Sequence, residues 1–458
     1  MNDKELTSTE LGSGLSLAAV YVFRMLGLFM VIPVIAVAAI EYPDYSPLLV
    51  GLAIGGYGLT QAILQIPMGI MSDRLGRKPI IYLGLALFAL GSLIAGIAES
   101  MTVLILGRVL QGAGAIAGAV MALASDVTRE SQRTKIMALI GVSIGLSFYL
   151  ALLLGPLIAA NYGVSAIFYL TAASALFCFP LVKFGVPNVQ PSSATGDALP
   201  KTEYLSALFS HPHLWRLNLL VLVLHLLITS FFVQIPVLLT DIGEPLARHY
   251  QVYGVVLLIS VAILVVLIRM ANVLTTQNMF NITLLLMAVG LVLLTQVPTY
   301  WLIVAAGISF FAGFNFLEAK MPAMVSSIAP AGQKGSAMGI YASFQFLGAF
   351  VGGMLSGAMN AYFDTKTTFV VCLLFIFLAS LVARGLANVE RVKRVTLGFS
   401  ESTGMDDDSI NHAMALLMAI EGVKDVSADP EAKAFYLKVD AKLFNTQLAL
   451  DSLHNTQK

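Results

Sequence analysis

Four charged or titratable side chains lie inside long apolar runs of this 458-residue chain: Arg24, Arg108, His225 and Glu318. A charged side chain at the centre of a bilayer costs about 2.5–3.5 kcal/mol on insertion scales, so such residues usually serve ion pairing, substrate binding or proton transfer. A carboxyl group in apolar surroundings holds its proton more readily than in water, and an imidazole titrates near neutral pH. This set therefore predicts proton transfer within a membrane.

Each candidate also has a structural interpretation. Glu318 is the first candidate for a proton-carrying carboxylate, and the alternative is a carboxyl group that is hydrogen-bonded for helix packing. His225 is the second candidate, although a lone histidine on an apolar helix face often only packs. Arg24 would bind an anionic substrate or tune a nearby acid, or else it joins helices through an ion pair or backbone carbonyls. Four amides would line a substrate cavity or hydrogen-bond between helices: Gln111, Gln234, Asn315 and Gln345.

The composition excludes a soluble globular protein. Hydrophobic residues make up 58% of the chain and charged residues 11%, which is typical of a protein that lies mostly in lipid. The formal net charge is zero and no basic patch stands outside the membrane flanks, so no nucleic-acid partner is expected. Cys178 and Cys372 each stand alone, and the sequence holds no nucleophile–base set or phosphate-binding loop. We therefore expect no enzyme activity, cofactor or metal site.

Twelve apolar runs are long enough to cross a bilayer as helices, since a span needs roughly 20 residues. They cover 14–39, 46–72, 78–98, 102–126, 134–160, 164–186, 213–240, 248–270, 278–296, 299–326, 334–360 and 366–388. An even number of spans places both termini on one side. The connections rich in lysine and arginine share that side, which predicts cytoplasmic termini.

A polar, proline-rich gap divides the spans six and six. The predicted domains are a six-helix bundle at 1–186, a linker at 187–212, a second six-helix bundle at 213–390 and a cytoplasmic domain at 391–458. The fold class is therefore an all-α membrane protein with a small α+β domain at its carboxyl end.

The connection between the second and third spans packs charges and glycines into ten residues. The group comprises Gly69, Asp73, Arg74, Gly76, Arg77 and Lys78. Glycine has no side chain, so a helix can approach closely at one position and the backbone can turn tightly at another. The three cations alone would suit any cytoplasmic loop, but such a loop explains neither the acid nor the glycines.

This loop resembles the motif between spans 2 and 3 of the major facilitator superfamily of transporters. The resemblance implies two six-helix bundles with a substrate site between them. It also implies that Asp73 caps the amino end of span 11 and pairs with Arg77, which would latch one conformation. Asp126, at the end of span 4, would join this latch, or it is a helix-terminal acid in water.

Two further segments resemble motifs of the same family. The run from Arg108 to Gly112 resembles a span 4 motif whose arginine is tied to proton coupling. Span 5 resembles the antiporter motif that bends the helix between the halves, through Gly141, Gly145, Gly155 and Pro156. After the proline this sequence runs Leu-Ile-Ala-Ala where the family has a further glycine, and this departure weakens the prediction of antiport.

After about residue 390 the composition becomes that of a soluble domain. Val395, Leu397 and Phe399 alternate as in a strand, and the remaining pattern gives the order β-α-β-β-α. This order resembles a ferredoxin-like domain that lacks its fourth strand. The acidic run 406–408 stands just before a helix, where acids pair with free backbone N–H groups, and the alternative is a cation site.

Together these features predict a secondary transporter of the bacterial inner membrane that works by alternating access. The predicted partners are a small-molecule substrate, protons and the lipid bilayer. Family resemblance and the apolar cavity helices favour proton-coupled export of small amphipathic compounds. Two alternatives stay open: a proton-coupled metabolite symporter, and a transceptor whose carboxyl-terminal domain senses a ligand or ion.

Overall fold

The computed structural model describes residues 6–188, 202–330, 333–386, 392–398, 407–429, 434–440 and 443–454. Within these residues, twelve helices are long and apolar enough to cross a membrane. Each overlaps one predicted span, so the prediction of twelve is confirmed. Part of the predicted linker, at 189–201, and Asp406 of the acidic run lie outside the described residues.

The helices follow the apolar runs closely. The first six spans are α1 (Ser8–Ala38, with a 3-10 turn at Ala39–Glu41), α2 (Pro47–Leu75), α3 (Arg77–Gly96), the pair α4 (Met101–Ala113) and α5 (Ala117–Asp126), α6 (Glu130–Tyr162) and α7 (Val164–Gly185). The last six are α9 (Leu214–Asp241), α10 (His249–Met270), α11 (Thr276–Leu294), α12 (Tyr300–Ile328), α13 (Lys334–Tyr362) and α14 (Thr365–Ala383). A short helix, α8 (Thr202–Ser210), lies in the segment predicted as a linker.

Local sequence explains where several helices begin and end. Ser46 accepts a hydrogen bond from the Leu49 N–H at 3.2 Å, and Pro47 follows at the first helical position of α2. Ser100 caps α4 in the same way through the Val103 N–H. Gly76 separates α2 from α3 with a φ of 94°, a left-handed conformation that favours glycine.

The fourth span differs from the single run predicted at 102–126. Helix α4 ends at Ala113 and α5 begins at Ala117, so the span is interrupted at Gly114. The Gly114 N–H donates to the Gln111 carbonyl, and a Cβ at this position would overlap the Gly84 carbonyl oxygen. The close approach of α3 therefore needs glycine here. The Gly114 carbonyl accepts from the Ile116 N–H at 2.9 Å, and its second lone pair can accept another partner.

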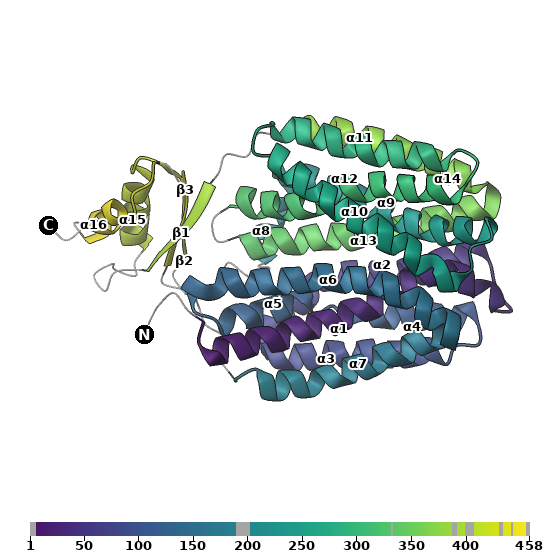
Figure 1. Ribbon diagram of the computed structural model, residues 1–458. Coiled ribbons are helices and arrows are strands. Elements are labelled where there is room, and N and C mark those ends of the chain that lie inside the picture. The colour runs from purple at the N-terminus through teal and green to yellow at the C-terminus, as the bar shows by residue number, and fades with distance from the viewer. Residues whose placement is uncertain are drawn as a thin grey trace.

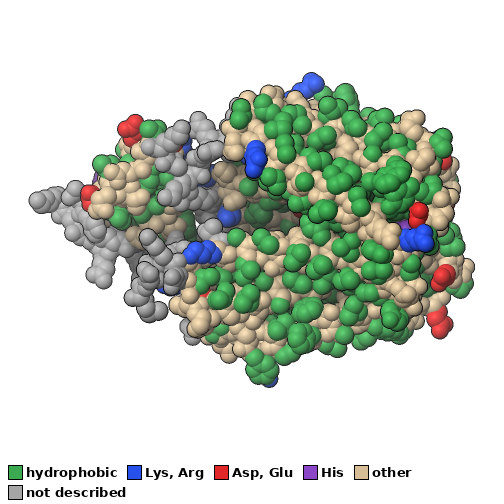
Figure 2. Space-filling view, viewed as in Figure 1, with side chains coloured by type: hydrophobic (Ala, Val, Ile, Leu, Met, Phe, Trp, Pro, Cys, Tyr) green, Lys and Arg blue, Asp and Glu red, His purple; other side chains and the backbone are tan. Residues whose placement is uncertain are grey.

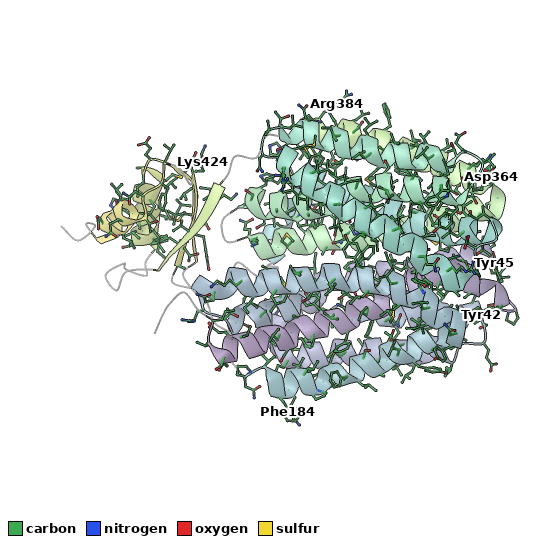
Figure 3. All side chains as sticks on the ribbon, in the orientation of Figure 1. Tyr42, Tyr45, Phe184, Asp364, Arg384 and Lys424 are labelled. Atoms are coloured by element: carbon green, nitrogen blue, oxygen red, sulfur yellow. The ribbon has the colours of Figure 1, made fainter. Side chains whose placement is uncertain are left out.

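The helices form two bundles that lie side by side, α1–α7 and α9–α14 (Figure 1). The start of α1 and the carboxyl-terminal domain lie at one end, which we call the tail end (Figure 1). The opposite end, marked by Tyr42, Tyr45 and Asp364, is the far end (Figure 3). Buried apolar side chains fill each bundle, including Phe88 in the first and Phe310 in the second. Leu152 of α6 and Val233 of α9 each pack into the apolar core of the other bundle.

The bundles are packed backbone to backbone where α2 meets α13. A Cβ on Gly353 would lie 2.7 Å from the Gly51 carbonyl oxygen, and one on Gly357 would lie 2.7 Å from the Pro47 carbonyl oxygen. Pro47 and Gly51 open α2 at the far end, so the far ends of the two bundles are closed against each other. Only residues without a side chain permit this distance between helices.

At the tail end the bundles separate. The surface is hollowed between them on the side that faces the carboxyl-terminal domain (Figure 2). A Cβ added to Gly141 or Gly145, in the tail half of α6, would meet no atom within 4 Å, whereas Gly155, in the far half, lies against the Met30 backbone of α1. The structure is therefore open at the tail end and closed at the far end.

The carboxyl-terminal domain has the predicted order β-α-β-β-α. Its elements are β1 (Val392–Gly398), α15 (Asp407–Met418), β2 (Val423–Asp429), β3 (Ala434–Asp440) and α16 (Thr446–His454). The antiparallel sheet has the order β1-β3-β2, which fits a ferredoxin-like domain. Phe435, Leu437 and Val439 on one face of β3 pack with Leu417 and Leu453 of the two helices.

The domain touches the membrane bundles through the opposite face of β3. The Lys438 ammonium donates to the Ile328 carbonyl at 2.8 Å, at the carboxyl end of α12. Ala434 and Tyr436, on the same strand face as Lys438, are also buried. Both faces of β3 are thus covered, although an antiparallel sheet can leave one of its faces exposed to water.

Candidate functional site

Three predicted residues from three helices meet in the second bundle. Gln345 of α13 donates from Nε2 to Glu318 Oε1 of α12 at 3.2 Å, and its Nε2 lies 2.8 Å from His225 Nε2 of α9. His225 Nε2 lies 3.8 Å from Glu318 Oε2. The structure therefore brings together both proton-carrier candidates and one of the predicted cavity amides, and we call these three residues the acid cluster.

The hydrogen bonds determine the state of the histidine. His225 Nδ1 lies 3.2 Å from the Val221 carbonyl oxygen, which can only accept, so this nitrogen carries a proton. Nε2 accepts from the Gln345 amide and is therefore unprotonated. This assignment, inferred from the bonds, makes the imidazole neutral, so it is no cationic partner for Glu318 in this conformation.

The acid cluster faces the space between the bundles. The Glu318 side chain is 35% exposed although it lies in the middle of a long helix. Phe346, next to Gln345, contacts the Tyr57 ring of the first bundle at a centroid distance of 6.3 Å. Asn315, one turn before Glu318, lies beside Tyr149 of α6. Contacts on both sides of the cluster thus cross to the other bundle.

The remaining cavity predictions have different outcomes. Asn315 also donates to the Ser260 hydroxyl at 3.3 Å and lies at the inter-bundle surface. Gln234 is fully buried and donates to Asn360 and Thr368, so it joins helices α9, α13 and α14. Gln111 is also fully buried, and it lies inside the first bundle. In the structure, these two glutamines form hydrogen bonds between helices, which is the alternative to lining a substrate cavity.

Arg24 lies inside the first bundle and is 2% exposed. Its Nη2 donates to the Gly114 carbonyl at 2.7 Å and to Gln61 Oε1 at 2.8 Å. The Gly114 carbonyl lies in the break between α4 and α5, where it accepts from both the Ile116 N–H and Arg24. The arginine therefore holds the interrupted span against α1 and α2, which is the carbonyl-bonded alternative to substrate binding.

Arg108 has a similar position in the same bundle and is 1% exposed. Nε donates to the Ala53 carbonyl at 3.1 Å, Nη1 donates to Gln111 Oε1 at 2.8 Å, and the guanidinium lies over the Tyr57 ring. Gln111 in turn donates to Ser92. This network joins α2, α3 and α4, and Tyr57 connects it to the inter-bundle contact with Phe346.

The charged loop forms a compact ionic cluster around Arg77, which is 5% exposed. Arg77 Nη1 pairs with Asp73 Oδ1 at 2.7 Å, and Nε pairs with Asp126 Oδ2 at 3.0 Å. Ser72 accepts a further bond from Nη1 at 3.3 Å. The pair implied by the resemblance is present, and Asp126 joins it from the end of α5.

The cap on span 11 is not formed in this conformation. Among the described residues, Asp73 bonds to Arg77 and makes no bond to the start of α13, and its side chain is 39% exposed. The separation of the bundles at the tail end accounts for this. Lys78 donates to the Val186 carbonyl and to Asn188, which ties the loop to the end of α7. Arg74 is exposed, and Gly69 carries the carbonyl that accepts from Ser72.

The predicted bend motif in span 5 lies along α6, a helix that also contacts the second bundle. Gly155 packs on the Met30 backbone, and Pro156 lies inside the continuous helix α6. Leu153 lies against Gly254 of α10 in the second bundle. In contrast, Gly141 and Gly145 lie in the tail half of α6, where the bundles are apart. A helix that approached α6 as the tail end closed would meet no side chain of α6 at these two positions.

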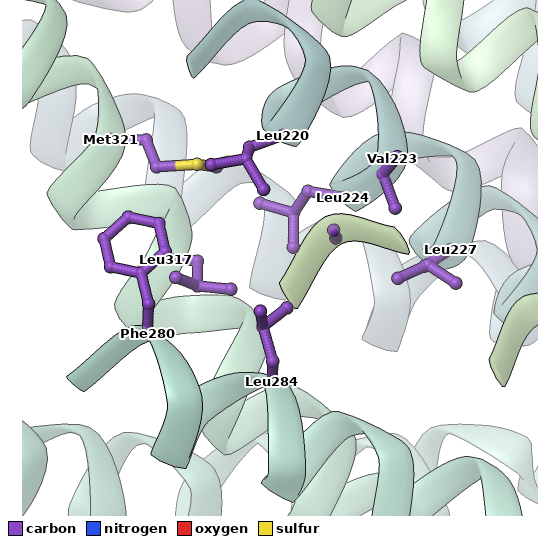
Figure 4. A pocket seen from close by; sticks show the side chains of 9 residues that line it. Leu220, Val223, Leu224, Leu227, Phe280, Leu284, Leu317 and Met321 are labelled. Carbon is purple, nitrogen blue, oxygen red and sulfur yellow. The ribbon is translucent and has the colours of Figure 1, made fainter. Parts of the chain in front are cut away.

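One pocket lies inside the second bundle, apart from the acid cluster (Figure 4). Its lining is wholly apolar: Leu220, Val223, Leu224, Leu227, Phe280, Leu284, Leu317, Met321 and Ala379. No predicted cavity amide reaches it. Since it offers no hydrogen-bonding group, it cannot orient a polar substrate.

Carboxylates outside the spans cap helices at the far end. Asp44 accepts from the Met101 N–H at 2.7 Å and from the Thr102 N–H, and these backbone donors lower the pKa of the carboxyl group. Asp364 caps α14 through Thr367, whose hydroxyl and N–H lower the pKa of that carboxyl group. Sequence analysis missed both caps. Asp364 stands directly before the apolar run of α14, which is a local signal, whereas Asp44 binds the start of α4 far along the chain and has no local signal.

Sequence analysis also missed residues around the two networks. Tyr57, Gln61 and Gln65 recur every fourth residue on α2, and this helical spacing of polar side chains could have indicated a polar face. Glu10 forms a capping box with Thr7 and pairs with Arg129 at 2.9 Å, which joins the starts of α1 and α6. The Thr-x-x-Glu pattern was its available signal.

Comparison with known proteins identifies the family of this chain. The model of the Major Facilitator Superfamily matches residues 17–279 and 269–439. The inner membrane transport protein YajR of Escherichia coli (strain K12) is 39% identical over 448 residues, which cover 97% of this chain and 98% of that protein. The quinolone resistance protein NorA of Staphylococcus aureus (strain MRSA252) is 25% identical, over 73% of this chain and 86% of that protein.

Solved structures with the same fold are more distant in sequence. The crystal structure of a D-xylose-proton symporter superposes with a TM-score of 0.66 at 15% identity, over 83% of this chain and 98% of that chain. A bacterial homologue of the human lysosomal transporter Spinster, in an inward-facing and occupied conformation, superposes with a TM-score of 0.65 at 14% identity, over 83% and 97% of the two chains.

Proposed function

Because this chain belongs to the Major Facilitator Superfamily, and is therefore a multi-pass membrane transporter and not an enzyme, we propose that it is a proton-coupled transporter in which Glu318 carries the proton. The single observation behind this proposal is the acid cluster. A carboxylate at membrane depth, 35% exposed and bonded to an amide on another helix, can exchange a proton with water and change its partners as the helices move.

His225 serves the same site as a neighbour and not as the carrier. Its neutral imidazole lies 3.8 Å from the Glu318 carboxylate, and it accepts from the Gln345 amide that also bonds to Glu318. Protonation of either group changes what Gln345 can donate to. The cluster thus links the charge of the acid to the relative position of α9, α12 and α13.

The proposed direction is export of small amphipathic compounds. The side chains around the acid cluster are largely aromatic, including Phe314 against His225, Phe346 and Tyr149, and they suit an apolar ring better than a sugar. The name of the relative NorA refers to quinolone resistance, which agrees with efflux. The partial antiporter motif in span 5 adds to this proposal.

The proposed location is the bacterial inner membrane, with both termini in the cytoplasm. The distribution of lysine and arginine in the connections supports this orientation, and the name of the relative YajR supports the membrane. The tail end would then be the cytoplasmic side, and the conformation described above would be open to the inside. The ionic cluster around Arg77 would close that side in the alternate conformation.

Transport of a fluorescent amphipathic cation tests the proposal. Proteoliposomes with an acidic lumen should accumulate ethidium above its external concentration, because protons that leave drive the dye inward. Glu318→Gln should lose this accumulation and keep exchange that needs no gradient. Glu99→Gln, the same change at an exposed acid outside the spans, should behave as the wild type.

Two results would oppose the proposal. Accumulation by Glu318→Gln equal to that of the wild type would remove Glu318 as the carrier. Accumulation driven only when the gradient is reversed would indicate symport, for which the same acid cluster would serve.

A further inference from the structure

Two buried polar atoms beside the acid cluster have no hydrogen-bond partner in the structure. One is the hydroxyl of Tyr341, a side chain that is 2% exposed, and the other is Glu318 Oε2. A buried tyrosine hydroxyl normally finds an acceptor, since leaving it unpaired costs about 1–3 kcal/mol. Glu318 Oε1 already accepts from Gln345, so Oε2 is the oxygen with free capacity.

The two groups belong to neighbouring helix faces. Tyr341 lies one turn before Gln345 on α13, so both side chains point to the same side of that helix. Gln345 reaches Glu318 from that side, and Tyr341 lies within the electrostatic field of the Glu318 carboxylate without a hydrogen bond to it. A movement of α13 along α12 would change which of these two donors the carboxylate meets.

The other neighbours do not take this role. His225 is neutral with its proton on Nδ1, and that proton is directed at the Val221 carbonyl. Gln345 uses its amide for Oε1 and for the histidine. Among the described residues, His225 and Gln345 are the side chains in contact with the Glu318 carboxylate, and neither has a proton left to donate to Oε2.

Charged and titratable groups on the surrounding helices lie elsewhere. On α12 itself Lys320 is two residues away and points to a different face. Helix α11 carries no charged residue. The remaining groups on the packed helices are Arg216 and Asp241 of α9, His249, Tyr250, Tyr253 and Arg269 of α10, and Lys334 and Tyr362 of α13.

We propose that in another conformation of the transporter the Tyr341 hydroxyl donates a hydrogen bond to Oε2 of the deprotonated Glu318, and so lowers the pH at which Glu318 takes up its proton. Tyr341 is a positioning residue, because it acts through Glu318. A donor that bonds to the charged form of an acid stabilises that form. The hydroxyl is free in the present conformation, so the bond forms and breaks as α13 moves, which makes the proton affinity of Glu318 depend on the conformation of the transporter.

This inference rests on the proposed function, and its test uses no substrate. Infrared spectra of the full-length protein in lipid nanodiscs are recorded as a function of pH, and the carboxyl C=O band of Glu318 is identified by its absence in Glu318→Gln. Tyr341→Phe should move the titration midpoint of this band upward by about one pH unit, because the charged form loses a donor. In the wild type, the ring C–O band of a tyrosine should change in step with the carboxyl band.

Tyr253→Phe is the matched control. Tyr253 is 3% exposed, its hydroxyl is also unpaired, and it lies on α10 against Phe232 and His249. This variant should leave the midpoint of Glu318 unchanged. If Tyr341→Phe does not fold, the wild-type spectra provide the test, because the tyrosine C–O band must then change in step with the Glu318 carboxyl band.

The outcomes separate the two proposals. A Glu318 midpoint in Tyr341→Phe equal to that of Tyr253→Phe, or a wild-type tyrosine band that ignores the carboxyl titration, overturns the role of Tyr341 and leaves Glu318 as the carrier. A Glu318 band that does not titrate between about pH 5 and pH 9 overturns both proposals, since a proton carrier must exchange its proton within the working range.

Discussion

Arg77 is held by two carboxylates and a serine hydroxyl, which surround its buried guanidinium. Asp126, whose side chain is 2% exposed, comes from α5, whereas Asp73 comes from α2. The three groups therefore join the ends of two helices to the start of α3. A buried ion pair adds little net stability when complete, but removal of one partner leaves a charge that has lost its compensation.

We therefore expect Asp126→Asn to destabilise the protein by about 1.5–3 kcal/mol, the value of a hydrogen bond to a charged group, because Arg77 keeps Asp73 as a partner. Thermal unfolding in detergent can be followed with a thiol-reactive dye, because Cys178 and Cys372 are both buried. Arg74→Ala removes an exposed cation from the same loop and should leave the unfolding temperature unchanged. Equal unfolding temperatures for Asp126→Asn and Arg74→Ala would contradict the role assigned to the pair.

The Asp44 cap makes stability depend on pH at the far end. The native pKa of this carboxyl group is lowered by the Met101 and Thr102 donors, whereas in the unfolded chain it is about 3.9. A lowered native pKa adds stability that is complete above the unfolded value and is lost as the pH falls through the native value. The stabilising effect should therefore be present at neutral pH and decline below about pH 4.

Asp44→Asn should lower the unfolding temperature at pH 7, and its difference from the wild type should shrink as the pH falls below about 4. Glu99→Gln changes an exposed acid near the same connection and serves as the control. A difference between Asp44→Asn and the wild type that stayed constant down to pH 3 would show that the carboxylate charge is not what stabilises α4.

At the scale of elements, the contact between α2 and α13 keeps the far end closed. Gly51, Gly353 and Gly357 place two backbones in direct contact there. At these three positions the backbones touch without a side chain between them, so this part of the contact holds only while both helices keep glycine there. This glycine contact, which we call the seam, can open and close as a unit when one bundle tilts against the other.

Gly353→Ala should shift the population toward conformations in which the far end is open, because the added Cβ would lie 2.7 Å from the Gly51 carbonyl oxygen. Spin labels at Glu41→Cys and Asp241→Cys, both exposed at the far end on different bundles, measure the separation in a background without Cys178 and Cys372. Gly141→Ala adds the same atom where nothing lies within 4 Å and should leave the distances unchanged. Identical distance distributions for the two variants would be incompatible with this role of the seam.

At the scale of the whole molecule, the carboxyl-terminal domain is joined to the helix that carries Glu318. Lys438 of β3 donates to the Ile328 carbonyl at the end of α12, where free carbonyls and the negative end of the helix favour a cation. His211, which precedes α9, lies in the field of this lysine. Burial, His213 and Lys438 together lower the pKa of the imidazole.

Lys438→Ala should release the domain from the end of α12. Spin labels at Glu421→Cys in the domain and Arg384→Cys at the end of α14, again without the native cysteines, should then give a broader distance distribution than in the parent. Lys366→Ala removes an exposed lysine at the far end and should not change it. An unchanged distribution in Lys438→Ala would mean that other contacts hold the domain.

The sequence alone determined the twelve spans, the six-and-six division of their runs and the β-α-β-β-α order of the last domain. Hydrophobic length and local periodicity are properties of neighbouring residues, so no tertiary information was needed. The pairing of Asp73 with Arg77 followed from family resemblance. The cap on span 11 did not form, because it depends on which end of the bundles is closed.

Tertiary structure alone decided which polar side chains share a site. His225, Glu318 and Gln345 come from three helices far apart in the chain, and no local pattern states that they touch. The same holds for Arg24, which binds a carbonyl within a helix break that the apolar pattern did not reveal. A charged residue inside an apolar run is visible in the sequence, and so is the free energy that its burial must cost. Its partner is not visible, because the partner depends on how helices pack, and packing depends on contacts between residues that are distant in the chain.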